Sequence, residues 1–285
     1  MVRRALMIFY CTFTIWAVSS FVAGVVNGNA ITVDFIDVGQ ADGALVTSAG
    51  GRTLLIDAGD NDGGERNVAT IVRFLNERRV QRLDVVAISH YHLDHYGGMM
   101  DLVRNFDIGM LILPKPADER DWNSHDRMLV GVRNDVKVVY AAAGDRLRIG
   151  EDLVAEVLFA DREATRTNDR TVVKRVTGFE SSFLFTGDMG FREEDMMLAS
   201  GMDFAADVVK VAHHGSRFSS RAEFFRAASP RYAVISVGRN GHGHPTQEAM
   251  DRIAESGARI LRTDHEGTIT FVVDGNGFRR RSRWL

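Results

Sequence analysis

The sequence predicts an α+β protein in which two β-sheets pack face to face and helices cover their outer faces. Three observations lead to this fold class: strand-like segments are many and short, helical segments are few, and neither a low-complexity linker nor an internal repeat divides residues 31–285. A strictly alternating doubly wound sheet would need more helices between its strands. The expected strands are apolar or β-branched runs at residues 31–38, 53–56, 84–89, 110–113, 136–140, 153–159, 171–176, 182–185, 208–212, 232–237, 259–261 and 268–273.

Helices are expected between some of these strands. Two segments show one apolar face at helical spacing: Val68, Ile71, Val72 and Leu75 before the charged end 76–79, and Met250, Ile253 and Ala254 between Pro245-Thr246 and the stop residue Gly257. Two shorter helices fit residues 193–199 and 221–228, and Pro230 ends the second.

Residues 1–30 differ from the rest and predict an export signal. A basic start (MVRR) precedes an uncharged, largely apolar run at 5–26, and GNA at 28–30 offers small residues for cleavage. An uncleaved N-terminal anchor is the alternative, because the run is close to the roughly 20 residues that span a bilayer. We therefore expect residues 31–285 to form one periplasmic or secreted domain, which would be membrane-anchored if the signal were retained.

Charge and cysteine content exclude several classes of protein. The 35 basic and 38 acidic residues give a formal net charge of −3, so the chain as a whole does not attract nucleic acid or anionic membranes. Cys11 is the only cysteine, which excludes an intramolecular disulfide framework and a cysteine-ligated zinc site. If the protein binds a metal, histidine and aspartate must hold it.

The strongest chemical signal is the segment 89–98 (SHYHLDHYGG), which follows an expected buried strand. Its imidazoles and carboxylate are ligand types that suit zinc, manganese or iron. His90 and His92 can reach one ion from the same side of an extended segment, whereas Asp94 and His95 point elsewhere and can serve a second ion about 3.5–4 Å away. The glycine pair permits a tight turn before a helix begins.

Three later segments repeat the pattern of an apolar strand that ends in a residue able to bind metal. They end at Asp188, at the pair His213 and His214, and at His244. Each alone has a plainer explanation, as a turn-former, a surface loop or a helix-entry residue. Together with the first cluster they predict one site, because converging strand ends commonly form one.

The order of these motifs resembles the metallo-β-lactamase superfamily of two-metal hydrolases: residues 55–60 (LIDAGD), 90–95 (HYHLDH), 186–188 (TGD), and then a late histidine. More narrowly, residues 37–42 (DVGQAD), 211–216 (VAHHGS), 243–245 (GHP) and 263–269 (TDHEGTI) are similar to the hydrolase domain of ComEC-type competence proteins and of related free-standing exported enzymes. The resemblance covers residues 31–273. It implies a four-layer αββα sandwich of two mostly antiparallel sheets, with metals at one edge.

The resemblance also implies two divalent ions, with Zn²⁺ favoured and Mn²⁺ as the alternative. Their ligands would be His90 and His92 at the first ion, Asp94, His95 and His244 at the second, and Asp188 between them.

Further residues gain roles from the same resemblance. Asp57 would orient a ligand histidine, and Asp37 and Asp42 would flank a glycine turn beside the site. Either His213 or His214 would face the substrate, donating a proton to the leaving oxygen or binding a phosphate oxygen. Asp94 and these two histidines are therefore our expected catalytic residues.

One departure from the family pattern concerns the first ion. Members usually place another histidine ligand between the main cluster and the TGD segment, yet only His125 lies there, in a stretch (118–127) that is expected to be exposed and polar. We assign His125 no role. Asn168 or Asp169 stands where that ligand is expected, so the first ion would be weakly held, or a single tightly bound metal would suffice.

These residues predict a metal-dependent hydrolase that uses a metal-activated water, most simply a phosphodiesterase acting on nucleic acid or on a choline-phosphate type of ester. One alternative is an acyl hydrolase of a lactam, lactone or thioester, which the fold also permits. Another is a non-catalytic DNA-binding or docking module, in which the basic tail 278–284 would contact phosphates, although a solvated chain end explains that tail more simply. The oligomeric state stays open.

Overall fold

The computed structural model describes residues 30–60, 65–164 and 166–281. Except for Ala30, the expected signal peptide or anchor lies outside these residues. Within the described ranges, no helix is both long and apolar enough to cross a membrane.

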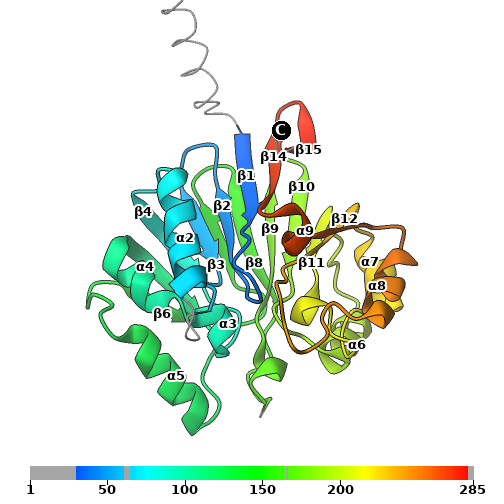
Figure 1. Ribbon diagram of the computed structural model, residues 1–285, viewed down its shortest axis with the longest axis horizontal. Coiled ribbons are helices and arrows are strands. Elements are labelled where there is room, and N and C mark those ends of the chain that lie inside the picture. The colour runs from blue at the N-terminus through cyan, green and yellow to red at the C-terminus, as the bar shows by residue number, and fades with distance from the viewer. Residues whose placement is uncertain (1–29, 61–64, 165, 282–285) are drawn as a thin grey trace, which may run out of the picture.

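Two β-sheets lie face to face and helices cover both outer faces (Figure 1), so the expected four-layer αββα architecture is confirmed. In the described residues the first sheet has eight strands. In spatial order they are β15 (Gly277–Arg280), β14 (Ile269–Asp274), β1 (Ala30–Phe35), β2 (Ala44–Thr47), β3 (Thr53–Ile56), β4 (Arg82–Ala87), β5 (Asp107–Leu113) and β6 (Lys137–Tyr140).

The second sheet has seven strands within the described ranges. In spatial order they are β13 (Arg259–Arg262), β12 (Tyr232–Ile235), β11 (Val208–Lys210), β10 (Ser181–Phe185), β9 (Val173–Gly178), β8 (Leu153–Phe159) and β7 (Arg146–Ile149). All twelve strands expected from the sequence are present.

Both sheets are mixed rather than mostly antiparallel. Pairing is parallel from β3 to β6 in the first sheet and from β10 to β13 in the second, and the remaining pairs are antiparallel. Parallel neighbours need crossover connections, and these are where the longer helices lie. Each sheet therefore has one helix-covered parallel half whose strands end in loops at the same edge.

Helices form the two outer layers. The first sheet is covered by α2 (Glu65–Glu77), α4 (Met99–Asn105) and α5 (Glu119–Leu129), and the second by α6 (Phe191–Ser200), α7 (Ala222–Ala228) and α8 (Gln247–Ala254) (Figure 1). Shorter turns are α3 (Leu93–Tyr96), α9 (Thr263–Glu266), η1 (Asn168–Arg170) and η2 (Ala212–Gly215).

Three apolar cores hold the layers together. Leu55 packs with Ile71 of α2 under the outer face of the first sheet, and Phe224 of α7 belongs to the core behind the second. Between the sheets, Phe183 and Phe271 meet edge to face with ring centroids 6.0 Å apart. Burial of such large apolar side chains is the main force that stabilises a sandwich.

Residues 118–127 are mostly exposed, as expected, but their helix was not predicted: they lie mostly in α5, where Asp118 accepts a hydrogen bond from the Asp121 N–H at 2.9 Å and His125 is buried. One prediction about local structure was wrong. The start of the basic tail is not a solvated end, because β15 pairs with β14 and Phe278 stacks on Phe271 at 5.3 Å between ring centroids. Strands β2 and β7 were also not foreseen.

Candidate metal centre

Strand ends from both sheets bring the predicted residues together at one edge of the sandwich. Asp57 follows β3 and His95 lies in α3 beyond β4, both in the first sheet, whereas Asp188 follows β10 and His214 follows β11 in the second. The Nε2 atom of His95 lies 3.2 Å from Oδ1 of Asp188. The two sheets therefore meet at these side chains.

The first donor group consists of His90, His92 and Asp188, and it offers three ligand atoms within 4.8 Å of one another. His90 Nε2 lies 3.1 Å from His92 Nδ1 and 3.7 Å from Asp188 Oδ2. Burial, reinforced by the neighbouring His95, holds the pKa of His90 well below its usual range. His90 is therefore neutral at pH 7, as a metal ligand must be.

The second donor group consists of Asp42, His95, Asp188 and His214, again with ligand atoms within 4.8 Å of one another. Asp94 lies against it, with Oδ2 3.0 Å from His214 Nε2 and 3.6 Å from His95 Nε2. Asp188 is common to both groups. The sequence expectation that Asp188 stands between the sites therefore agrees with its position.

The second group concentrates negative charge, which favours the binding of cations. Burial alone would lower the pKa of His95, but the surrounding carboxylates, led by Asp188 and Asp94, raise it well above its usual range. Burial alone would likewise raise the pKa of Asp188, but His95 and His90 hold it well below its usual range. Carboxylates gathered this closely in a buried place need a positive charge among them.

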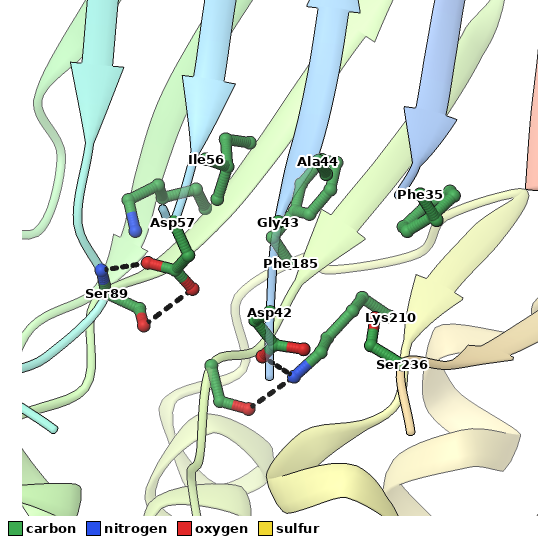
Figure 2. A pocket seen from close by; sticks show the side chains of 12 residues that line it. Phe35, Asp42, Gly43, Ala44, Ile56, Asp57, Ser89, Phe185, Lys210 and Ser236 are labelled. Carbon is green, nitrogen blue, oxygen red and sulfur yellow. Dashed lines mark hydrogen bonds and ion pairs between the residues drawn. The ribbon is translucent and has the colours of Figure 1, made fainter. Parts of the chain in front are cut away.

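Asp57 contacts both Ser89 and His95. Its carboxylate accepts hydrogen bonds from the Ser89 N–H at 2.7 Å and the Ser89 hydroxyl at 2.9 Å (Figure 2). It also lies 2.9 Å from Nδ1 of His95. Because Asp57 engages Nδ1, Nε2 is the ring nitrogen of His95 that faces Asp188. Asp57 thus has the contacts of a residue that orients a ligand.

Asp42 is held by a buried lysine that the sequence analysis passed over. Lys210 of β11 forms an ion pair with Asp42 (Figure 2), and its ammonium also donates to the Gly187 carbonyl at 3.3 Å. A charged residue inside the apolar run VVKVA was the available signal, because a buried lysine requires a partner. Asp37, in contrast, accepts only a local hydrogen bond from the Gly39 N–H at 3.4 Å, and it belongs to neither donor group.

His213 and His214 point in different directions. Both residues have a left-handed backbone, with φ values of 51° and 52°. His214 is buried and its Nδ1 contacts the Ser236 carbonyl at 2.8 Å, which leaves Nε2 facing Asp94. His213 is one-third exposed, with Nε2 3.7 Å from Asp188 Oδ2. Of the two, His213 is the one that faces solvent.

His244 does not lie where the resemblance places it. Among the described residues it belongs to neither donor group, and its ring lies beside His213, with centroids 5.6 Å apart. Burial, together with His213, lowers the pKa of His244 to about 4. The late imidazole of the second group is that of His214, because the left-handed turn of η2 directs this ring inward.

The residues expected near the first ion divide into two kinds. His125 is buried away from the donors, with Nε2 2.9 Å from the Tyr140 hydroxyl. Asn168 has a buried Oδ1 without a hydrogen-bond partner, and η1 leads to Thr171, whose hydroxyl accepts from the Asp188 N–H at 3.2 Å. Asn168 therefore has a side-chain oxygen without a partner close in sequence to Thr171, which contacts Asp188. Among the described residues, Asp169 makes no contact with the donor groups.

The donor set fits two divalent ions. His95 Nε2 and Asp188 Oδ1 are buried without a hydrogen-bond partner, although they face each other, and an ion would satisfy both. Imidazole nitrogen with carboxylate oxygen suits zinc or manganese. Two donor groups that share one aspartate, set at the edge of an αββα sandwich, define the class as one with a candidate metal centre between its sheets.

The chain belongs to the metallo-β-lactamase superfamily, whose sequence model matches residues 36–239. It is 31% identical over 264 residues to ComE operon protein 3 of Bacillus subtilis, covering 84% of this chain and 32% of that protein. It is 30% identical over 256 residues to Competence protein ComA of Neisseria gonorrhoeae, covering 88% of this chain and 33% of that protein. The chain thus spans about a third of the length of these relatives.

Solved structures agree with the fold. The metallo-β-lactamase fold protein YhfI from Bacillus subtilis superposes with a TM-score of 0.57 at 14% identity, covering 84% of this chain and 99% of YhfI. CmlA, a diiron β-hydroxylase from Streptomyces venezuelae, also gives 0.57, at 16% identity, covering 84% of this chain and 53% of CmlA. Identities this low concern the fold alone, and they leave the reaction to be argued from the site.

Proposed function

We propose that this protein is an exported metal-dependent hydrolase of phosphate esters, most specifically a phosphodiesterase. The observation that carries the proposal is the pair of donor groups joined at Asp188, with His213 exposed beside them. Two divalent ions held there would supply a water-derived nucleophile at neutral pH and neutralise charge on the phosphoryl oxygens. No side-chain nucleophile is then required.

The chain's own residues would hold and orient the reactants. Asp94 contacts both His95 and His214, so it fixes the geometry of the second group. His213 stands at the exposed side, where its imidazole can give a proton to the departing oxygen. Asp57 and the ion pair of Asp42 with Lys210 keep the donors in place from within the sandwich.

A phosphate ester is favoured over an acyl substrate for two reasons. The first donor group lacks the additional histidine that is typical of acyl-hydrolysing branches, and Asn168 or Asp169 stands where the sequence pattern expects that ligand. The names of the relatives, a ComE operon protein and a competence protein, also suit a nucleic-acid substrate better than a lactam. DNA is therefore the substrate we would test after simple diesters.

The decisive experiment measures hydrolysis of bis(p-nitrophenyl) phosphate by the purified protein, stripped of metal and then titrated separately with zinc and manganese. We expect metal-dependent turnover that Asp94→Asn reduces by several orders of magnitude without changing the far-ultraviolet circular dichroism spectrum. A fully active Asp94→Asn variant would refute the assignment. If two ions bind but no turnover follows, the acyl hydrolase is favoured. If no metal binds, the non-catalytic DNA-binding or docking module is favoured.

Export is part of the proposal and rests on residues 1–30 alone. The competence-protein relatives are in keeping with a place at or beyond the membrane. Fractionation of cells that express the full chain would test it: a shortened periplasmic or secreted form indicates cleavage, and a full-length membrane-bound form indicates an anchor.

A further inference from the structure

A cavity lies between the two sheets. Its volume is about 220 Å³, and it is lined by side chains of β3–β6 on one side and of β7–β9 with the preceding loop on the other. The lining residues are Leu54, Ala87, Met110, Ile112, Lys137, Val139, Asp145, Arg146, Leu147, Ala155, Glu156, Val157 and Lys174. None of them belongs to a donor group of the metal centre.

The cavity opens at one edge of the sandwich, beside the edge strands β6 and β7. β6 ends the first sheet and β7 ends the second, and both line it. Ile112, Leu147 and Ala155 contribute to the core between the sheets, yet each keeps part of its surface exposed. Solvent therefore reaches apolar walls that a tightly packed sandwich would close.

The buried end of the cavity carries a positive charge. Lys174 of β9 is 3% exposed, and its ammonium donates one hydrogen bond, to the Val172 carbonyl at 3.1 Å. Within the described residues it forms no ion pair with any carboxylate, in contrast to Lys210 with Asp42, although Asp57 lies near enough for its charge to act on the ammonium. An ammonium has three donors, so Lys174 is left short of acceptors.

The charge at the open end of the cavity is mixed. Arg146 is paired with Glu156 at 3.8 Å, and Asp145 stands beside it. Lys137 is exposed and lies outside every ion pair formed by the described residues. The charged side chain that lacks a partner inside is a cation, so the complementary ligand is an anion with an apolar body.

We propose that this cavity binds a small straight-chain carboxylate, with the carboxylate on the Lys174 ammonium and the alkyl chain between the sheets. At about 30 Å³ for each water-sized group, the volume accommodates about seven such groups. Medium-chain fatty acids have this size and this charge. Lys174 also lines the pocket that contains Asp42 and Asp57, so the cavity adjoins the metal centre, but the proposal does not depend on the ester hydrolysis proposed there.

Calorimetric titration of the purified full chain with hexanoate, heptanoate, octanoate and decanoate tests the proposal. We expect affinity to rise about four-fold with each added methylene until the cavity is full, and then to stop rising. Octanol, which has the chain without the charge, should bind at least ten-fold more weakly than octanoate. Absence of saturable binding at every chain length would overturn the proposal.

Two variants test separately the charge of Lys174 and the volume of the cavity. Lys174→Met keeps the length of the side chain and should weaken octanoate binding at least ten-fold, whereas the exposed Lys115→Met serves as the matched control and should change nothing. Ala155→Phe fills the cavity, keeps Lys174, and should abolish binding at an unchanged melting temperature. If Lys174→Met fails to fold, Ala155→Phe alone still tests whether the cavity is the binding site. Undiminished binding to Ala155→Phe would refute the site.

Discussion

His213 and His214 show how two adjacent identical residues acquire different surroundings. Both have a left-handed backbone, which costs roughly 1–2 kcal/mol for a residue that is not glycine. The contacts of His214 with Ser236 and Asp94 offset that cost. As a result, one imidazole joins the buried donors while the other remains available to a substrate, and the two substitutions should have different effects.

Replacing His213 tests its role as proton donor. His213→Gln should retain both ions and hydrolyse bis(p-nitrophenyl) phosphate at close to the normal rate, because p-nitrophenolate departs without a proton. Hydrolysis of a dinucleotide, whose leaving group is an alkyl oxygen, should fall by roughly 10²–10⁴. Turnover of both substrates and the metal content by mass spectrometry check this prediction. Equal losses on both substrates would contradict it, and the exposed His242→Gln is the control.

Replacing Lys210 tests the ion pair beneath the donors. Lys210→Met leaves the Asp42 carboxylate buried without its counter-charge and should lower the free energy of unfolding by about 3–5 kcal/mol. Urea denaturation of metal-free protein measures this directly. The double variant Lys210→Met with Asp42→Asn should recover at least half of the loss. If it recovers nothing, the two residues do not act as a pair.

Helices α6 and α7 are connected by a single buried carboxylate. Glu194 of α6 accepts hydrogen bonds from the backbone N–H groups of Ser220 and Arg221, which immediately precede α7. Its side chain is fully buried, and this burial raises its pKa from 4.5 to about 7. The ionisation of one residue therefore influences how this outer layer is held on the second sheet.

Stability should depend on pH through Glu194. A raised pKa means that the folded state binds the proton more tightly, so the contribution is complete below pH 4.5 and is lost as the pH rises through about 7. Relative to Glu194→Gln, the wild-type protein should lose about 3 kcal/mol of unfolding free energy between pH 4.5 and pH 8. Urea titrations of both proteins at the two pH values measure the difference. A constant difference would contradict the assignment.

The elements that could be predicted from the sequence are those with a strong local pattern. Twelve strands and the helices at α2, α6, α7 and α8 follow from apolar periodicity. β7 (RLRI) was missed because its two arginines point to solvent at the edge of a sheet, and α5 was missed because it is largely polar with few buried residues. In both cases tertiary packing, rather than local preference, selects the structure.

In the candidate site, too, only residues that belong to a local motif could be predicted. Residues 90–95 form a contiguous motif, so their joint placement could be foreseen from the sequence, as could that of Asp188. The choice of His214 instead of His244, and the pairing of Lys210 with Asp42, depend on backbone turns and on contacts across the sandwich. Such long-range features leave no periodic trace in a single sequence.

At the scale of the whole molecule, the metal centre connects the two sheets. The first sheet supplies residues 90–95, whereas the second supplies Asp188 and His214. Ions bound there would therefore link the two halves of the sandwich as well as serve in chemistry.

Metal removal should accordingly destabilise the fold. Zinc at a thousand times its dissociation constant adds about 4 kcal/mol per site to the free energy of unfolding, which raises the melting temperature. Asp188→Asn, which affects the residue common to both groups, should abolish most of this rise, whereas His92→Gln should remove only the part due to the first group. Melting curves with and without chelator measure this. A melting temperature that ignores zinc would exclude a linking role.

The pairing of β1 with β14 fixes the position of Ala30, the first described residue, relative to the metal centre. Ala30 is opposite Asp274 in the register, and the chain leaves the other end of β1 into the loop that carries Asp42. At about 3.3 Å per residue, six residues of strand place Ala30 roughly 20 Å from the end of β1 that is nearest the metal site. If the proposed anchor is retained, it would hold the protein at the end of β1 far from the donor residues, so the metal-binding edge would face away from the lipid surface.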